Sequence, residues 1–102
     1  MKPSEALRLH RSKILQIAEN ARVGNVRVFG STARGENRED SDLDLLVDAT
    51  EHTSLFDLGA MAIDLEALLS VHVDIVTSGA LSALPPHRRA MAAEIMDEAK
   101  SI

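Results

Sequence analysis

The 102-residue chain contains no cysteine, tryptophan or tyrosine, and its only aromatic residues are Phe29 and Phe56. Without cysteine, disulfide frameworks, zinc–thiolate sites and thiol nucleophiles are all excluded. A core built from this sequence must be aliphatic, because 45% of the residues are hydrophobic while only 2% are aromatic. The length fits a single domain spanning residues 1–102.

Long apolar stretches are also missing. No run approaches the roughly 20 residues that a membrane-spanning helix needs. The N-terminal segment MKPSEALRLHRSK lacks the apolar stretch of a signal peptide. Together with the absence of cysteine, these features predict a soluble, cytoplasmic protein with no membrane partner.

Basic residues are outnumbered, since 11 Lys and Arg against 16 Asp and Glu give a net charge of −5. Non-specific nucleic-acid binding relies on a basic excess and on aromatic stacking surfaces. Direct nucleic-acid binding is therefore not expected. An acidic surface would instead suit a basic partner protein.

Hydrophobic periodicity predicts six elements in the order helix, strand, strand, helix, strand, helix. Their expected ranges are 4–21, 26–29, 42–47, 55–69, 71–77 and a last helix that begins near Pro85-Pro86 and buries Met91, Ile95 and Ala99. The stripe of the middle helix is expected to comprise Leu55, Leu58, Ala62, Leu65 and Leu69. This order predicts an α/β fold in which a small mixed β-sheet is flanked by helices.

Three carboxylates stand out on the predicted strands. Asp42 and Asp44 share one strand face, with Cα atoms about 6.5–7 Å apart, and no basic residue lies within that strand. Asp74 lies in the equally apolar strand VHVDIV. If the strands of Asp44 and Asp74 pair, the three carboxylates converge and could hold one or two Mg²⁺ ions. His72 shares a strand face with Asp74; packing is the favoured role for its side chain, and supporting a metal ligand from behind is the alternative.

Gly30-Ser31 lies where the first predicted strand ends. Glycine lets the backbone approach a ligand closely. If Ser31 opens a short helix through Thr32-Ala33-Arg34, its hydroxyl and the following N–H groups form an anion site, and Arg34 could add a charged contact to phosphate. A phosphate-binding turn beside a carboxylate cluster is what a metal–triphosphate substrate requires.

The segment VFGSTARGENREDSDLDLLVD, with Gly30-Ser31 followed after ten residues by Asp42-Leu43-Asp44, resembles the signature of the DNA polymerase beta-type nucleotidyltransferase superfamily. The later strand VHVDIVT matches the place of the family's third carboxylate. Among its members, this short chain most resembles the minimal nucleotidyltransferases (MNT) encoded beside HEPN-domain ribonuclease toxins. The resemblance implies the DNA polymerase beta-like nucleotidyltransferase fold.

The same resemblance implies site roles and a reaction. Asp42 and Asp44 would hold Mg²⁺, Asp74 would complete the metal site and help to activate the acceptor hydroxyl, and Gly30 and Ser31 would contact the triphosphate. The implied reaction is transfer of AMP from ATP to a tyrosine hydroxyl of a HEPN toxin, which makes this chain an antitoxin that could form a hetero-oligomer with the toxin. Two alternatives remain open: a non-catalytic module that masks its partner, and nucleotidyl transfer to a small-molecule hydroxyl.

Other motifs fit the sequence less well. An EF-hand loop starting at Asp40 would need glycine where Leu45 stands. A nucleophile elbow around Ser31 lacks both outer glycines, and a Walker A loop fails because Gly35 is followed by Glu36. For Arg34, a salt bridge on the surface is as well supported as a phosphate contact.

Overall fold

The computed structural model describes all 102 residues. The elements are α1 (Pro3–Leu9), α2 (Arg11–Asn20), β1 (Val23–Phe29), β2 (Leu43–Ala49), α3 (Leu55–Leu69), β3 (Val73–Thr77), α4 (Ser78–Ser82), the 3₁₀ turn η1 (Pro86–Arg88), α5 (Arg89–Glu98) and β4 (Lys100–Ser101). The predicted α/β class and the order of the six main elements are confirmed.

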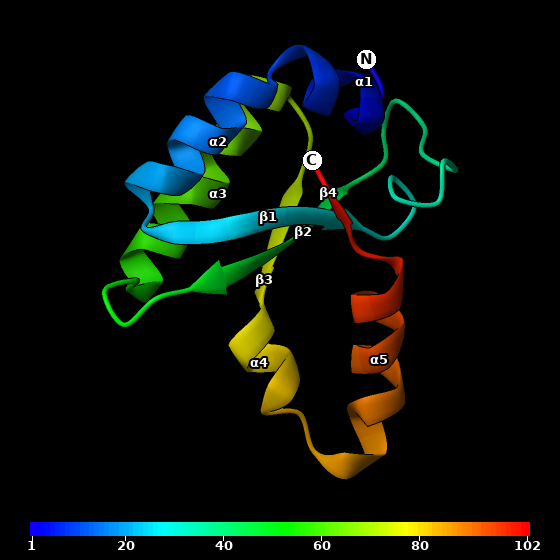
Figure 1. The fold of residues 1–102 in the computed structure, drawn as a ribbon. Coiled ribbons are helices and arrows are strands. Elements are labelled where there is room, and N and C mark those ends of the chain that lie inside the picture. The colour runs from blue at the N-terminus through cyan, green and yellow to red at the C-terminus, as the bar shows by residue number, and fades with distance from the viewer.

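The strands form one mixed sheet in the order β3-β2-β1-β4. β1 runs antiparallel to β2 and β4, whereas β2 and β3 run parallel. Helices α2 and α3 cover one side of the sheet, and α4 and α5 extend on the other (Figure 1). A parallel β2–β3 pair needs a crossover connection, and α3 provides it.

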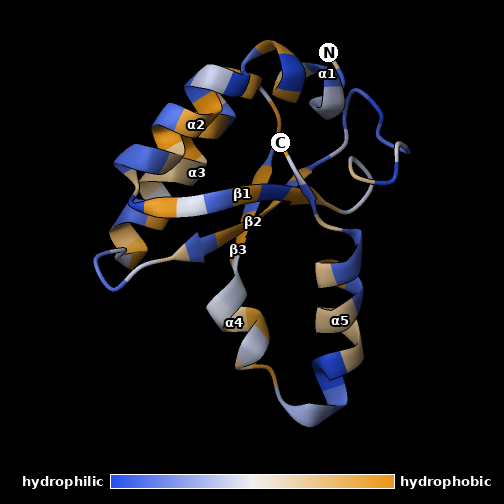
Figure 2. Cartoon of the chain, in the orientation of Figure 1, coloured by the Kyte–Doolittle hydropathy of each residue, from blue (hydrophilic) through white to orange (hydrophobic).

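Alternation along β2 divides the hydrophobic residues between two clusters. Leu43, Leu45 and Val47 are fully buried in the main core with α2 and α3, while Leu46 packs on the other face with Phe29 and Leu81. Hydrophobic residues follow the strands and the sheet-facing sides of α2 and α3, while the 35–41 segment is hydrophilic (Figure 2). Both faces of β2 are therefore covered by hydrophobic residues, and Asp44 lies on the same face as Leu46.

The structure corrects two details at the N-terminal end. The single helix expected over 4–21 is two helices, and His10, at φ −108° and ψ 19°, separates them. β1 begins at Val23, so Gly24-Asn25 lies within the strand at a register shift. Asn25 adopts φ 51°, a left-handed conformation that asparagine tolerates better than most residues, and this accommodates the irregularity.

Helix α3 has the predicted bounds, and a capping box fixes where it begins. The Ser54 hydroxyl accepts a hydrogen bond from the Asp57 N–H at 3.0 Å, and the Asp57 carboxylate accepts one from the Ser54 N–H at 2.9 Å. This reciprocal capping satisfies two free N–H groups of the first turn. Leu55, however, is 85% exposed and does not belong to the buried stripe, which contains Met61, Leu65 and Leu69.

The C-terminal half adds two elements to the predicted order, α4 and β4. The last helix begins after Pro85-Pro86, with η1 as its first turn. Ile95 and Ala99 pack against the Phe29 cluster as expected, but Met91 is 44% exposed. No helix of the structure has the length and apolar content required to cross a membrane.

Removing buried volume beneath the sheet should destabilise the fold. We expect Leu45→Ala to lower the free energy of unfolding by about 2–5 kcal/mol, because it leaves a cavity beside a fully buried strand residue. Leu55→Ala, at an exposed position, should change it by no more than about 0.5 kcal/mol. Urea denaturation followed by circular dichroism measures both values, and equal losses would contradict the assigned core.

Candidate functional site

Asp44 and Asp74 lie directly opposite each other on neighbouring parallel strands. The register of β2 and β3 pairs Leu43 with Val73, Asp44 with Asp74 and Leu45 with Ile75. Neighbouring strands lie about 4.8 Å apart, so the two carboxylates share one face of the sheet at short range. This is the convergence that the sequence pattern predicted for these two residues.

Asp42 lies just before β2 and joins the same group. Ligand-type atoms of Asp42, His72 and Asp74 all lie within 4.8 Å of one another, and the three residues are exposed. Oxygen atoms of carboxylates are the ligands that Mg²⁺ prefers. The structure therefore brings all three predicted carboxylates to one end of the β2–β3 pair.

Asp44 is the least solvated of the three acids. Its burial raises the pKa of the Asp44 carboxyl above the usual range, and the negative charges of Asp74 and Asp42 raise this pKa further. Like charges at short range in a partly buried setting disfavour the ionised form. A bound cation would relieve this conflict.

Gly30 makes room for Asp44. It follows Phe29, which pairs with Asp44 across β1 and β2, and it adopts φ +73°. A Cβ atom at residue 30 would overlap Asp44 Oδ2 and approach Asp44 Cγ to 3.3 Å. The position thus requires glycine both for its backbone conformation and for the space that the carboxylate occupies.

The segment after Gly30 forms consecutive turns over residues 30–35, so the short helix considered for Ser31 through Arg34 is absent. Arg34 N–H donates to the Gly30 carbonyl at 3.2 Å, and Glu36 N–H donates to the Ser31 carbonyl at 2.9 Å. Ser31 is half-buried. The buried Asn37 side chain accepts a hydrogen bond from Ser4 N–H at 3.0 Å and so ties this segment to α1.

Glu98 of α5 binds the N–H group of Gly30 that was predicted to contact phosphate, and no local sequence signal indicated this contact. Its carboxylate accepts a 2.7 Å hydrogen bond from Gly30 N–H and pairs with Arg34 Nη1 at 3.1 Å. The hydrogen bond from Gly30 N–H, followed by the bond from Arg34, holds the pKa of Glu98 below its usual value. Arg34 also pairs with Glu36, so the salt bridges that the sequence left open for it are present.

His72 connects the acidic cluster to α3. Its Nε2 lies 2.9 Å from Asp74 Oδ1, and its Nδ1 lies 2.8 Å from Glu66 Oε2. The hydrogen bond to Asp74 raises the pKa of His72, which favours the imidazolium form beside these carboxylates. Expecting His72 to be a packing residue was wrong, because its side chain is 60% exposed and bonded at both nitrogens.

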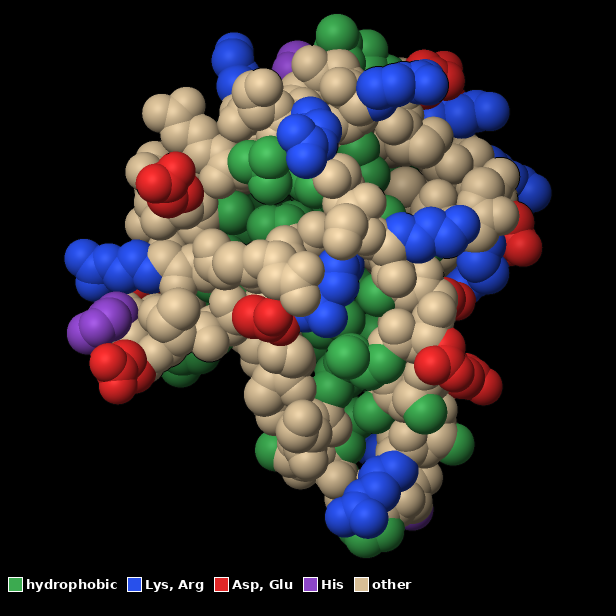
Figure 3. All heavy atoms as spheres, in the orientation of Figure 1, with side chains coloured by type: hydrophobic (Ala, Val, Ile, Leu, Met, Phe, Trp, Pro, Cys, Tyr) green, Lys and Arg blue, Asp and Glu red, His purple; other side chains and the backbone are tan.

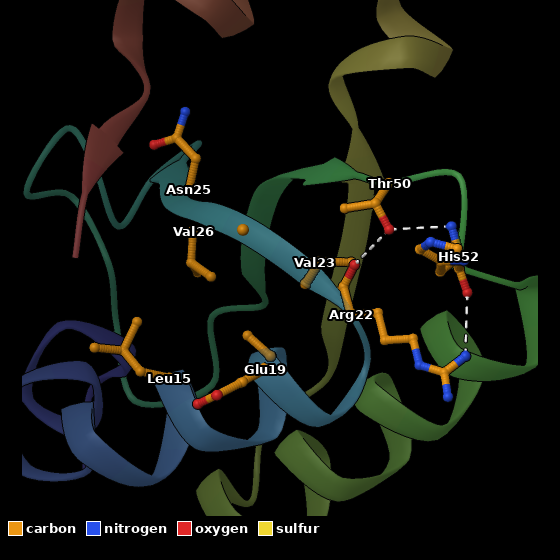
Figure 4. A pocket seen from close by; sticks show the side chains of 10 residues that line it. Leu15, Glu19, Arg22, Val23, Asn25, Val26, Thr50 and His52 are labelled. Atoms are coloured by element: carbon orange, nitrogen blue, oxygen red, sulfur yellow. Dashed lines mark hydrogen bonds between the residues drawn. The ribbon is translucent and has the colours of Figure 1, made fainter.

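The largest hollow on the surface lies elsewhere, at the opposite end of β1. It has a volume of about 630 Å³ and is lined by Leu15 and Glu19 of α2, the start of β1, Thr50 and His52 (Figure 4). Thr50 Oγ1 accepts a hydrogen bond from His52 N–H at 3.1 Å. None of the clustered carboxylates lines this hollow, so it is separate from the candidate site.

The fold is a mixed sheet with carboxylates at its strand ends beside a glycine turn, and residues 10–99 match the nucleotidyltransferase domain family. The chain belongs to that family, and the clustered carboxylates lie within the matched residues.

Individual relatives show which members of the family this chain is similar to. The chain is 43% identical over 68 residues to the protein adenylyltransferase MntA of Thermococcus cleftensis, covering 67% of this chain and 69% of the relative. It is 34% identical over 77 residues to a protein of Methanocaldococcus jannaschii assigned the same activity, covering 76% and 86%.

Solved structures also resemble this chain in fold. One assigned as a minimal nucleotidyltransferase superposes with a TM-score of 0.78 at 41% identity, covering 97% of this chain and 95% of that one. A toxin–antitoxin crystal structure with AMP-PNP shares the fold, with a TM-score of 0.68 at 21% identity over 88% of this chain and 69% of that one. The predicted resemblance to minimal nucleotidyltransferases is thus confirmed.

Gly30→Ala should damage the site through sterics alone. The added Cβ meets the Asp44 side chain and imposes a left-handed backbone on alanine, so we expect a loss of about 1–2 kcal/mol in the free energy of unfolding. Gly24→Ala is the matched control, because nothing lies within 4 Å of its added Cβ. If chemical denaturation gives both variants wild-type stability, the tight Gly30–Asp44 approach is not a constraint.

Glu98→Gln should strengthen binding of a nucleoside triphosphate. The substitution removes the negative charge that competes for Gly30 N–H and Arg34, so we expect the Kd to fall at least ~3-fold. Calorimetric titration with a non-hydrolysable triphosphate measures the effect. Glu94→Gln, on the exposed face of the same helix, should leave the Kd unchanged. An unchanged or weaker affinity for Glu98→Gln would mean that Glu98 does not compete with the ligand.

Proposed function

We propose that this chain is an antitoxin nucleotidyltransferase that transfers AMP from ATP to a hydroxyl group, a tyrosine in the leading case, of a cognate HEPN ribonuclease toxin. The observation that carries the proposal is the pairing of Asp44 with Asp74 beside the Gly30 turn. The names of the relatives support it, since they include protein adenylyltransferases and a toxin–antitoxin complex with an ATP analogue.

The donor set fits Mg²⁺. Asp42, Asp44 and Asp74 supply only carboxylate oxygens, and a cation bound among them would favour the ionised form of Asp44, whose pKa is raised by burial and by the charges of Asp74 and Asp42. Magnesium bound there would neutralise the triphosphate and polarise the phosphorus that is attacked. Asp42 and Asp44 would be its main protein ligands, and Asp74 would complete the set.

The protein side chains supply orientation and proton transfer. Gly30 N–H, the Ser31 hydroxyl and Arg34 would hold the β- and γ-phosphates once Glu98 is displaced from them. Asp74 would accept the proton of the acceptor hydroxyl. The acceptor oxygen then forms its bond to the α-phosphorus while the bond from that phosphorus to pyrophosphate breaks.

The acceptor tyrosine of the proposed reaction belongs to the partner. Residues 1–102 contain no tyrosine, so a tyrosine-linked AMP cannot reside on them. The proposed transfer therefore joins AMP to a residue of another protein.

Asp44→Asn should reduce the rate of AMP transfer at least ~100-fold, because it removes a ligand of the metal that stabilises the transition state. The measurement is the intact mass of the HEPN protein after incubation with this chain, ATP and magnesium. Asp40→Asn is the matched control, since Asp40 is an exposed acid of the preceding turn outside the cluster.

Undiminished transfer by Asp44→Asn would overturn the site assignment. Neutralisation of the toxin by Asp44→Asn at stoichiometric but not trace amounts, with no mass gain caused by the wild type, would favour masking. Mass gain only on a small-molecule hydroxyl would favour the small-molecule alternative.

A further inference from the structure

The outer face of α3 carries large apolar side chains that contact almost nothing. Phe56, one of only two aromatic residues in the chain, is 89% exposed, and Ile63 is 67% exposed. Leu55, at 85%, lies beside them. Soluble proteins rarely leave such side chains grouped in solvent without a use for them.

These side chains form one continuous strip, here termed the α3 stripe. Its members are Leu55, Phe56, Gly59, Ala60, Ile63 and Ala67, all exposed. Spacings of three and four place them on one face of the helix. Gly59 has open space around its Cα, so the middle of the stripe is shallow between the larger Phe56 and Ile63. A shallow centre between bulky ends can accept the ridge of another helix.

The charged side chains of α3 itself, those of Asp57, Asp64 and Glu66, are all acidic, and Arg22 lies near Asp57 where the helix begins. No Lys or Arg occurs between residues 39 and 87, whereas ten of the sixteen acids lie there, Asp64 of α3 and the exposed Glu51 among them. The basic residues belong to the two ends of the chain. In Figure 3 many of them gather over α1, α2 and the segment after β1. The stripe therefore presents an apolar centre with an acidic border.

This charge pattern indicates which kind of partner can bind to the α3 stripe. In a symmetric dimer of this chain the stripe would meet itself, and the acids at its border would face each other. A partner with an apolar helix face flanked by Lys and Arg would meet both the apolar centre and the acidic border. We propose that the α3 stripe docks such a basic, apolar helix face of the acceptor protein; this rests on the proposed function for the identity of the partner.

Docking on α3 would bring the acceptor toward the carboxylates. Ala67, at one end of the stripe, adjoins Glu66, which accepts a 2.9 Å hydrogen bond from Val73 N–H and contacts His72. His72 in turn contacts Asp74. Only Glu66 and His72 therefore separate the end of the stripe from Asp74. A partner bound along α3 could extend a hydroxyl-bearing segment around the edge strand β3 to the candidate site.

The test is the affinity of this chain for the HEPN-domain acceptor of the proposed function, measured by isothermal titration calorimetry. We expect the double variant Phe56→Ser/Ile63→Ser to raise the Kd at least ~30-fold, because it truncates both anchors of the stripe. Leu9→Ser is the matched control, as Leu9 is 65% exposed on α1, outside the stripe, and should leave the Kd unchanged. Circular dichroism checks that each variant is folded.

Two further readouts separate docking from catalysis. The double variant should raise the KM for the acceptor protein while leaving kcat near the wild-type value. Asp64→Lys should slow association at low salt, and the difference should shrink at high salt because border charges act by steering.

Wild-type affinity of the double variant would overturn the docking proposal, as would a stripe-dependent dimer of the isolated chain in sedimentation. The proposed function fails separately if the wild-type complex forms but the partner gains no AMP mass. In that case stripe-dependent binding would still support docking.

Discussion

The parallel pairing of β2 with β3 is the contact on which the rest of the site depends. Leu43, Leu45 and Val73 are buried on the opposite face and fix the register, because a slip of one residue would turn a carboxylate into the aliphatic core. Burial of these side chains therefore holds Asp44 and Asp74 together against their mutual repulsion. The hydrophobic face of the sheet sets the geometry of the charged one.

Two basic side chains contact this concentration of acids. His72 bridges Asp74 and Glu66, and Arg34 pairs with Glu98 where Glu98 binds the Gly30 turn. Under the proposed function, a metal ion or the triphosphate would replace some of these internal contacts. A ligand that binds here must replace contacts that the protein already makes with itself. The net free energy of binding is therefore smaller than the protein–ligand contacts alone suggest.

The parts of the fold and of the candidate site that depend on neighbouring residues in the sequence could be predicted. The α3 bounds follow from Ser54 and Asp57, and the convergence of Asp44 and Asp74 follows from period-two alternation in two apolar strands. The contribution of Glu98 could not be predicted, since 68 residues separate it from Gly30 and only the packing of α5 brings them together. The break at His10 and the exposure of Leu55 likewise depend on tertiary packing, which helical periodicity does not encode.

The division of charge along the chain gives the candidate site one basic and one acidic side. An acidic segment alone would hold a metal or a basic partner but would repel a triphosphate. Arg34 and the Gly30 turn come from the basic N-terminal part, and the antiparallel pairing of β1 with β2 places them beside Asp44. One side of the site thus suits phosphate and the other suits cations. The α3 stripe lies wholly within the acidic segment, so a basic partner docking there need not compete with the triphosphate for the same charges.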